Sequence, residues 1–83
     1  MVTVYTKDYC PYCTRAKTLL KNAGIAFEEI DITNSPEIMD ELRQKSRMMT
    51  VPQIFAGDTL LGGYDQIAAL HEKGELVELC CTN

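Results

Sequence analysis

Residues 2–24, with the sequence VTVYTKDYCPYCTRAKTLLKNAG, contain the pattern that decides the fold. The β-branched and aromatic residues of 2–6 predict a short strand. From Tyr12 onward, apolar residues recur at helical spacing until Gly24, a residue type that commonly ends helices. The segment Cys10-Pro11-Tyr12-Cys13 therefore lies where a strand passes into a helix.

The rest of the chain predicts three more strands and two more helices. We expect strands over 25–32, 51–56 and 59–62, a helix that begins after Ser35, and a helix over 64–73. This order predicts an α/β fold with a mixed sheet, because a helical crossover joins parallel strands and a hairpin joins antiparallel ones. The loop with the cysteines then lies at the carboxyl edge of the sheet, where open α/β sheets bind ligands.

Length and composition limit the class of protein. A chain of 83 residues predicts one domain over residues 1–83. Its content of 46% hydrophobic and 24% charged residues is that of a globular protein and argues against disorder. The net charge of −4 disfavours nucleic acid and anionic membranes as partners, because both require clustered Lys and Arg.

Targeting signals are not expected in this sequence. The first basic residue follows the initial apolar run instead of preceding it, and no window approaches about 18 consecutive apolar residues. We therefore expect a cytoplasmic protein, whose thiols are kept reduced. In that compartment a Cys-x-x-Cys pair is more often redox-active or metal-binding than structural.

Cys10 and Cys13 have the position and spacing of a redox-active dithiol. Unpaired N–H groups and the positive end of the helix dipole stabilise an anion at a helix start. An ordinary thiol with a pKa of about 8.5 is only about 3% ionised at pH 7. One helix terminus contributes only about 0.3–2 kcal/mol, so we expect Lys7 and hydrogen bonds of the loop to contribute to the ionisation of Cys10. Cys10 is predicted to attack, and the more buried Cys13 to resolve.

A metal site is the rival interpretation of the cysteines. Structural zinc takes four ligands, usually as two closely spaced pairs, and the other candidates are His71, Cys80 and Cys81. The adjacent Cys80 and Cys81 lack that spacing, so we expect no zinc site. An iron–sulfur cluster shared by the Cys10 residues of two chains remains an alternative.

Three segments of the chain resemble the signature segments of the dithiol glutaredoxins. They are Cys10-Pro11-Tyr12-Cys13, Thr50-Val51-Pro52-Gln53-Ile54-Phe55 and Gly62-Gly63-Tyr64-Asp65, in the expected order and spacing. The resemblance covers essentially the whole chain. It implies the thioredoxin fold, a four-stranded mixed sheet flanked by three helices.

The resemblance also implies a glutathione site beside the dithiol. In the family, the proline that corresponds to Pro52 is cis and faces the dithiol. The backbone of Val51, which follows Thr50, is then expected to pair with the cysteine of glutathione, as in strand addition. Asp65 and the backbone at Gly63 and Tyr64 are expected to hold its γ-glutamyl end.

Two further residues belong to the implied glutathione site. Lys7 corresponds to a lysine that meets the glycine carboxylate of glutathione. Tyr12 packs its ring either on the sheet edge or on the bound tripeptide. No metal ligands are implied.

Several residues depart from the family pattern. Tyr64 stands where the family often has cysteine or serine, so we expect a bulkier, aromatic rim. Met39 stands where Gln or Arg often contacts the glycine carboxylate, and the candidates to replace that contact are Arg43, Gln44 and Arg47. Met48 and Met49 are expected to serve as wall or core packing.

The resemblance implies a glutathione-dependent thiol–disulfide oxidoreductase. It would reduce protein disulfides and glutathione mixed disulfides, with glutathione as co-substrate and no tightly bound cofactor. We expect a monomer whose partners are disulfide-containing or glutathionylated proteins, ribonucleotide reductase being one candidate. The alternatives are an iron–sulfur cluster carrier and a dithiol electron carrier reduced by thioredoxin reductase.

The remaining charged and sulfur-containing residues have no predicted role. We expect Glu28 and Glu29 to form a solvated face of the second strand. Cys80 and Cys81 are expected to be frayed terminal thiols, with intermolecular disulfides on oxidation or glutathionylation as the alternatives. His71 is expected to be a solvated or packed residue.

Overall fold

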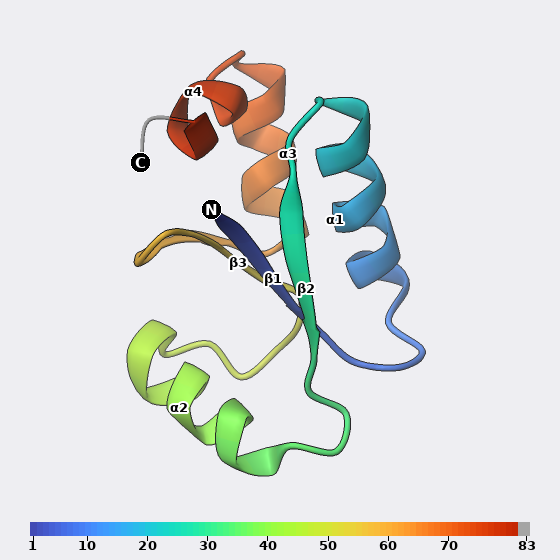
Figure 1. Cartoon of the computed structure of the whole chain (residues 1–83), viewed down its shortest axis with the longest axis vertical. Helices are drawn as coiled ribbons and strands as arrows, with labels where there is room; N and C mark the ends of the chain where they lie inside the picture. The colour runs from blue at the N-terminus through green and yellow to red at the C-terminus, as the bar shows by residue number, and fades with distance from the viewer. Residues whose placement is uncertain (82–83) are drawn as a thin grey trace.

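The computed structural model describes residues 1–81 and has a four-stranded mixed sheet (Figure 1). The strands are β1 (Val2–Thr6), β2 (Phe27–Asp31), β3 (Gln53–Ala56) and β4 (Thr59–Gly62), in the order β2-β1-β3-β4. β1 runs parallel to β2 and antiparallel to β3, and β3 pairs with β4 in a hairpin. The predicted thioredoxin-type sheet is therefore confirmed.

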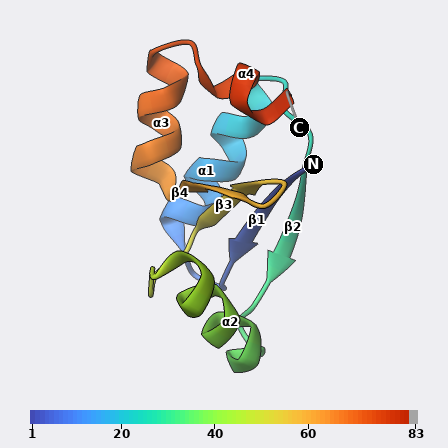
Figure 2. The same ribbon diagram turned by 90° about the vertical axis from the view of Figure 1, so that its left-hand side faces the viewer.

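Within residues 1–81, four helices accompany the sheet, one more than predicted. They are α1 (Pro11–Asn22), α2 (Pro36–Ser46), α3 (Tyr64–Glu72) and α4 (Leu76–Cys81). α1 and α3 lie on one side of the sheet and α2 on the other (Figure 2). None of the helices in residues 1–81 is long and apolar enough to cross a membrane.

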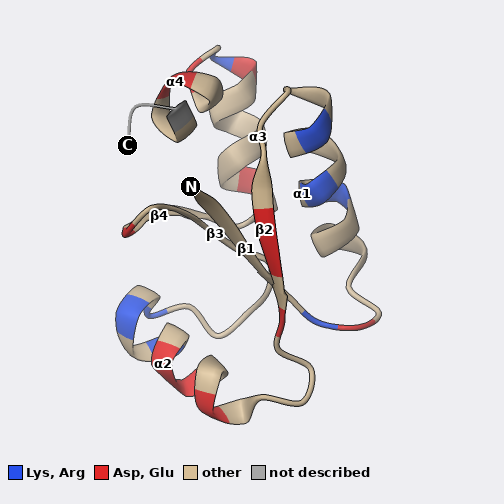
Figure 3. Cartoon of the chain, in the orientation of Figure 1, with Lys and Arg blue, Asp and Glu red and all other residues tan. Residues whose placement is uncertain are grey.

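Two hydrophobic clusters follow from the alternation of side chains along β1. Val2 and Val4 point to one face, where they pack with Leu20 of α1 and Ile67 of α3. Tyr5 points to the other face and belongs to the cluster with Leu42 of α2. Neither β1 nor β3 contains a charged residue, and Figure 3 shows the charged positions on β2, the helices and the loops. The two central strands are therefore the core of the domain.

The ends of α1 follow the sequence signals. Cys10 is the N-cap and Pro11 the first helical residue, where the missing N–H leaves no hydrogen bond unmade. Gly24 follows the helix at φ 75°, a left-handed conformation that glycine adopts without steric cost. Ser35 is at the N-cap of α2, as predicted, but its side chain makes no capping hydrogen bond.

The prediction for Cys80 is wrong. We expected a frayed thiol, whereas Cys80 is 7% exposed and lies in the same cluster as Val2 and Leu20. It comes from α4, which also buries Leu76. A helix of this length has no stability of its own, and packing against the core holds it. The side chain of Cys81 lies outside the described part of the chain.

Two predicted strands are longer than the observed ones. Ile25 lies outside β2, is buried in the core and donates its N–H to the carbonyl of Leu20, so it belongs to the end of α1. Val51 and Pro52 precede β3 because a proline has no N–H for the strand pairing. The loop that they form becomes part of the site.

Packing of α4 on the core gives a direct test. Leu76 is 1% exposed, so Leu76→Ala should lower the free energy of unfolding by about 2–5 kcal/mol. The matched control is Val77→Ala on the same helix, since Val77 is 46% exposed and should change stability by about 0.5 kcal/mol or less. Urea denaturation measures both. Equal effects of the two substitutions would mean that α4 is not packed as described.

Candidate active site

The dithiol lies at the N-terminus of α1, as predicted. Cys10 and Cys13 form a disulfide, and their Cα atoms are 5.2 Å apart. The backbone N–H of Cys13 donates a hydrogen bond to Sγ of Cys10 at 3.1 Å, so this sulfur caps the helix. Cys13 is 2% exposed, whereas Cys10 is only partly buried. The two sulfurs therefore differ in access, with Cys10 on the outside.

The loop before β3 forms the opposite wall of the site. The Val51–Pro52 peptide bond is cis, as the resemblance implied. The carbonyl oxygen of Val51 lies 3.8 Å from Sγ of Cys10. In the described chain, no residue accepts a hydrogen bond from the Val51 N–H. This N–H is therefore available to an extended peptide lying next to Cys10.

Gln53 holds this loop in place, a role that the sequence analysis did not assign. Its side chain is completely buried, and Nε2 donates to the carbonyls of Thr50 at 3.0 Å and Met48 at 3.2 Å. Its Oε1 accepts a hydrogen bond from Ser46, at the end of α2, at 2.8 Å. A polar residue within the apolar run before and along β3 was the signal that could have identified it.

A cavity of about 390 Å³ brings together seven of the eight residues predicted to bind glutathione. They are Tyr12, Thr50, Val51, Pro52, Gly63, Tyr64 and Asp65. The eighth, Lys7, lines the two cavities next to the loop after β1 instead. Met48 forms part of the wall, as expected, but Met49 is exposed and packs in neither wall nor core.

The start of α3 forms one end of this cavity. The N–H of Gly63 donates to Oε1 of Gln66 at 2.8 Å, so a ligand does not need to satisfy it. Gly62 has φ 115°, and a Cβ there would lie 2.7 Å from Cγ of Gln66. Only glycine therefore fits at this turn. The next N–H groups, of Tyr64 and Asp65, lie at the positive end of the helix dipole.

Two tyrosines form the rim between α1 and α3. The ring centroids of Tyr12 and Tyr64 are 6.0 Å apart, and the planes are tilted by 43°. The guanidinium carbon of Arg15 lies 5.2 Å from the centroid of the Tyr12 ring. The expected aromatic rim is therefore present. Arg15, to which the sequence analysis gave no role, lies over one of its rings.

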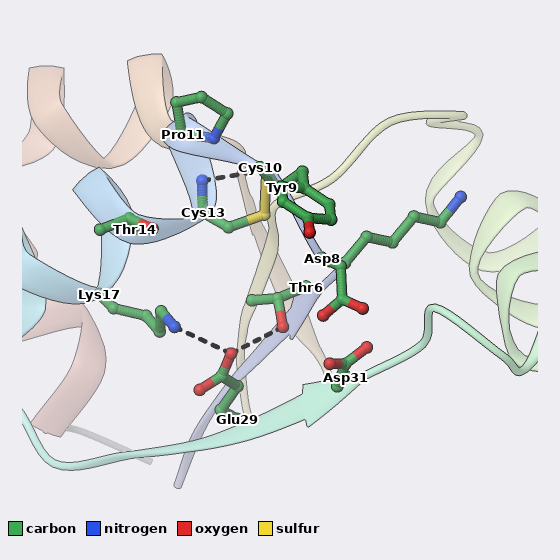
Figure 4. A pocket seen from close by; sticks show the side chains of 11 residues that line it. Thr6, Asp8, Tyr9, Cys10, Pro11, Cys13, Thr14, Lys17, Glu29 and Asp31 are labelled. Atoms are coloured by element: carbon green, nitrogen blue, oxygen red, sulfur yellow. Dashed lines mark hydrogen bonds and ion pairs between the residues drawn. A yellow bond between two sulfur atoms is a disulfide. The ribbon is translucent and has the colours of Figure 1, made fainter.

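A second cavity, of about 470 Å³, lies on the other side of the dithiol (Figure 4). Oε2 of Glu29 accepts hydrogen bonds from Oγ1 of Thr6 at 2.8 Å and from Nζ of Lys17 at 3.0 Å. The bond from Thr6, followed by that from Lys17, holds the pKa of Glu29 below its ordinary value of 4.5. Glu29 is exposed, as predicted, and it is also part of a polar cluster beside the cysteines, a role that the sequence analysis did not assign.

The candidate replacements for the missing second-helix contact do not meet at the site. Met39 lines a small cavity together with Lys7. Arg43 pairs with Asp40 of its own helix, and Arg47 ends α2 in a left-handed conformation. None of Arg43, Gln44 and Arg47 lines the cavity that contains Val51. In residues 1–81, no group of three or more His, Cys, Asp or Glu side chains could hold a metal ion.

Taken together, the mixed sheet, the dithiol at the start of α1 and the cis-proline loop opposite it define a thiol–disulfide oxidoreductase of the thioredoxin fold.

Comparison with known proteins narrows this class to a family. The glutaredoxin family profile matches residues 2–61. A glutaredoxin of Pseudomonas aeruginosa is 47% identical over 75 residues, which cover 90% of this chain and 89% of that protein. Glutaredoxin 3 of Escherichia coli is 43% identical over 75 residues, which cover 90% of both. The chain belongs to the glutaredoxin family.

Solved structures agree with this assignment. The solution structure of a glutaredoxin from Brucella melitensis has a TM-score of 0.87 at 44% identity, over 98% of this chain and 88% of that one. The crystal structure of a buckwheat glutaredoxin–glutathione complex has a TM-score of 0.89 at 32% identity, over 95% of this chain and 74% of that one.

Replacement of Gln53 tests its role in the loop. Gln53→Leu keeps the volume but removes the donor to the partly buried carbonyls of Met48 and Thr50. Each lost hydrogen bond costs about 0.5–1.5 kcal/mol, so the free energy of unfolding should fall by about 1–3 kcal/mol. The KM for a glutathione mixed disulfide should rise as well, because the loop with Val51 loses its support. The control is Gln44→Leu, at an exposed position of α2, which should leave stability and KM unchanged. An unchanged KM in Gln53→Leu would show that the loop does not depend on this side chain.

The Thr6–Glu29 hydrogen bond makes a prediction about pH. Thr6→Val removes the main donor, so the pKa of Glu29 should rise toward 4.5. In the unmodified protein the folded pKa is lower than the unfolded one. The cluster therefore stabilises the fold above about pH 4.5, and this contribution is lost as the pH falls through the folded pKa.

Titration of the Glu29 carboxyl carbon by NMR measures this shift. Thr3→Val is the control, because Thr3 is on the same strand and pairs with Glu28 rather than with Glu29. An unchanged titration in Thr6→Val would exclude the hydrogen bond as the cause.

Proposed function

We propose that Cys10 is the attacking thiolate and Cys13 the resolving thiol of a glutathione-dependent thiol–disulfide exchange. The difference in access between the two sulfurs supports this assignment. Cys10 is partly exposed at the helix start and faces the Val51 carbonyl, whereas Cys13 is buried one turn inside α1. The N–H groups at the start of α1 and the helix dipole favour the thiolate form of Cys10.

With a glutathionylated substrate, Cys10 alone completes the cycle. Its thiolate attacks the glutathione sulfur, the mixed disulfide bond breaks, and the substrate leaves as a thiolate. A second glutathione thiolate then attacks the glutathione sulfur bound to Cys10. Glutathione disulfide forms, and Cys10 returns as a thiolate.

With a protein disulfide, Cys13 takes part. Attack by Cys10 forms a mixed disulfide with one substrate sulfur and releases the other as a thiolate. Cys13 then loses its proton and attacks Sγ of Cys10, which forms the Cys10–Cys13 bond and releases the reduced substrate. Two glutathione molecules restore the dithiol and leave as glutathione disulfide. The scheme needs no tightly bound cofactor.

The cavity beside Val51 is the proposed glutathione site. The N–H of Val51 is free in the described chain and would pair with the cysteine backbone of glutathione. The γ-glutamyl end carries both a carboxylate and an ammonium group. The helix start at Tyr64 would hold the carboxylate, and the Asp65 side chain the ammonium. Lys7 would reach the glycine carboxylate from the neighbouring loop.

Residues 1–83 are proposed to act as one glutaredoxin-like domain. Although the family profile ends at residue 61, α3 and α4 pack on the same cluster as α1, which supports a single unit. The proposed location is the cytoplasm, where glutathione keeps thiols reduced. Protein partners would be disulfide-containing or glutathionylated proteins, and ribonucleotide reductase is a candidate for direct assay.

Two serine variants test the roles of the cysteines. Cys13→Ser should keep most of the turnover of a small glutathione mixed disulfide, because that cycle uses Cys10 alone. Cys10→Ser should lose it by at least about 10³-fold, since a hydroxyl cannot replace the thiolate nucleophile. The assay couples glutathione and glutathione reductase to NADPH oxidation, with thioredoxin reductase as the comparison. Loss of activity in Cys13→Ser together with retention in Cys10→Ser would reverse the assignment.

A further inference from the structure

A groove of about 410 Å³ runs between α1 and α3, outside the proposed glutathione site. Its lining includes Thr14, Arg15, Leu19 and Asn22 of α1, and Tyr64 and His71 of α3. The α1 residues are spaced as one stripe of a helix, and the two α3 residues are seven positions apart and share a face. Two helical stripes therefore face each other along this groove, which we call the α1–α3 groove.

The α1–α3 groove is continuous with the site of chemistry. Tyr64 lines both this groove and the cavity beside Val51. At the same end, Thr14 directly follows Cys13. A substrate whose disulfide has reached Cys10 can therefore extend along the groove without leaving the surface.

The charge of the groove differs from that of the protein. The chain has a net charge of −4, but among residues 1–81 no acidic residue lines the α1–α3 groove. All charged positions of α1 are basic, namely Arg15, Lys17 and Lys21 (Figure 3). Arg15 is exposed, lies over the Tyr12 ring, and forms no ion pair within residues 1–81. Its guanidinium group is available to a carboxylate.

The other side of the dithiol has a different charge. The cavity of Figure 4 is lined by the carboxylates of Asp8, Glu29 and Asp31 and by the ammonium groups of Lys7 and Lys17, so its formal net charge is −1. The ammonium group of Lys17 is paired with Glu29. The α1–α3 groove, with Arg15 as its charged residue, has a formal net charge of +1, so an acidic segment is favoured on the side of Arg15.

We propose that the α1–α3 groove binds an extended segment of a protein substrate, with an acidic side chain two positions from the substrate cysteine placed against Arg15. The inference rests on the proposed function, because it assumes that a disulfide of the substrate meets Cys10. From Thr14 to Asn22 the groove follows α1 for about 12 Å, at about 1.5 Å per residue. An extended chain rises about 3.3 Å per residue, so about four residues fit.

Peptide substrates of matched sequence test this proposal. Two short glutathionylated peptides would differ only at two positions, the second residue before and the second residue after the cysteine. Both positions are glutamate in one peptide and lysine in the other. The glutathione mixed disulfide of 2-mercaptoethanol is the third substrate and has no polypeptide. The variants are Arg15→Glu and, as a matched charge change on the same helix outside the groove, Lys21→Glu. The measurement is kcat/KM for each pair.

The expected result is a reversal of preference. The unmodified protein should favour the glutamate peptide by about 1.4- to fivefold, which corresponds to the roughly 0.2–1 kcal/mol of an exposed ion pair. Arg15→Glu should favour the lysine peptide instead, whereas Lys21→Glu should keep the original preference. The preference is the ratio of kcat/KM for the two peptides within one protein, so an effect of Arg15→Glu on glutathione binding cancels in it. Turnover of the small mixed disulfide measures that effect separately.

Two results would overturn the proposal. One is an equal loss of preference in Arg15→Glu and Lys21→Glu, which would indicate only the overall charge of the protein. The other is equal turnover of both peptides by the unmodified protein. If the small mixed disulfide is not reduced at all, the proposed function itself fails, and the docking inference with it.

Discussion

The pairing of β1 with β3 brings the reactive sulfur to its binding wall. Tyr5 near the end of β1 is in register with Gln53 at the start of β3, so the loop after β1 and the loop before β3 meet at one edge of the sheet. Cys10 comes from the first loop and Val51 from the second, and they are in contact across 41 positions of sequence. A shift of this register by one residue would turn the core face of β1 toward the wrong side and separate the two loops.

Much of the site could be predicted because its signals are local. The Cys10–Cys13 spacing at a helix start and the glycines before α3 depend on a few consecutive residues. The resemblance to the glutaredoxins supplied the arrangement of these segments around the dithiol, including the cis bond before Pro52. The strands were predicted for a similar reason, since side-chain alternation along β1 is visible in the sequence.

The features that were missed depend on contacts between distant segments. α4 is too short to form alone, and only the core behind Leu76 and Cys80 makes it a helix. Gln53 is an ordinary polar residue until the loop before β3 wraps around it. The sequence predicts that Glu29 is a surface residue of β2, which it is. Its place in the polar cluster beside the cysteines depends on Thr6 of β1 and Lys17 of α1. The periodicity of apolar residues within one segment does not show which distant residues will contact that segment in the fold.

The capping of α1 by the sulfur of Cys10 affects the choice of inactive variant for trapping a bound substrate. Alanine at this position would remove the nucleophile and the helix cap together, and the lost cap would cost about 0.5–2 kcal/mol. Serine removes the thiolate chemistry but is itself a favoured cap residue, and its hydroxyl can accept the N–H of Cys13. A complex trapped with the serine variant would therefore preserve the cap of α1, whereas one made with alanine would lack it.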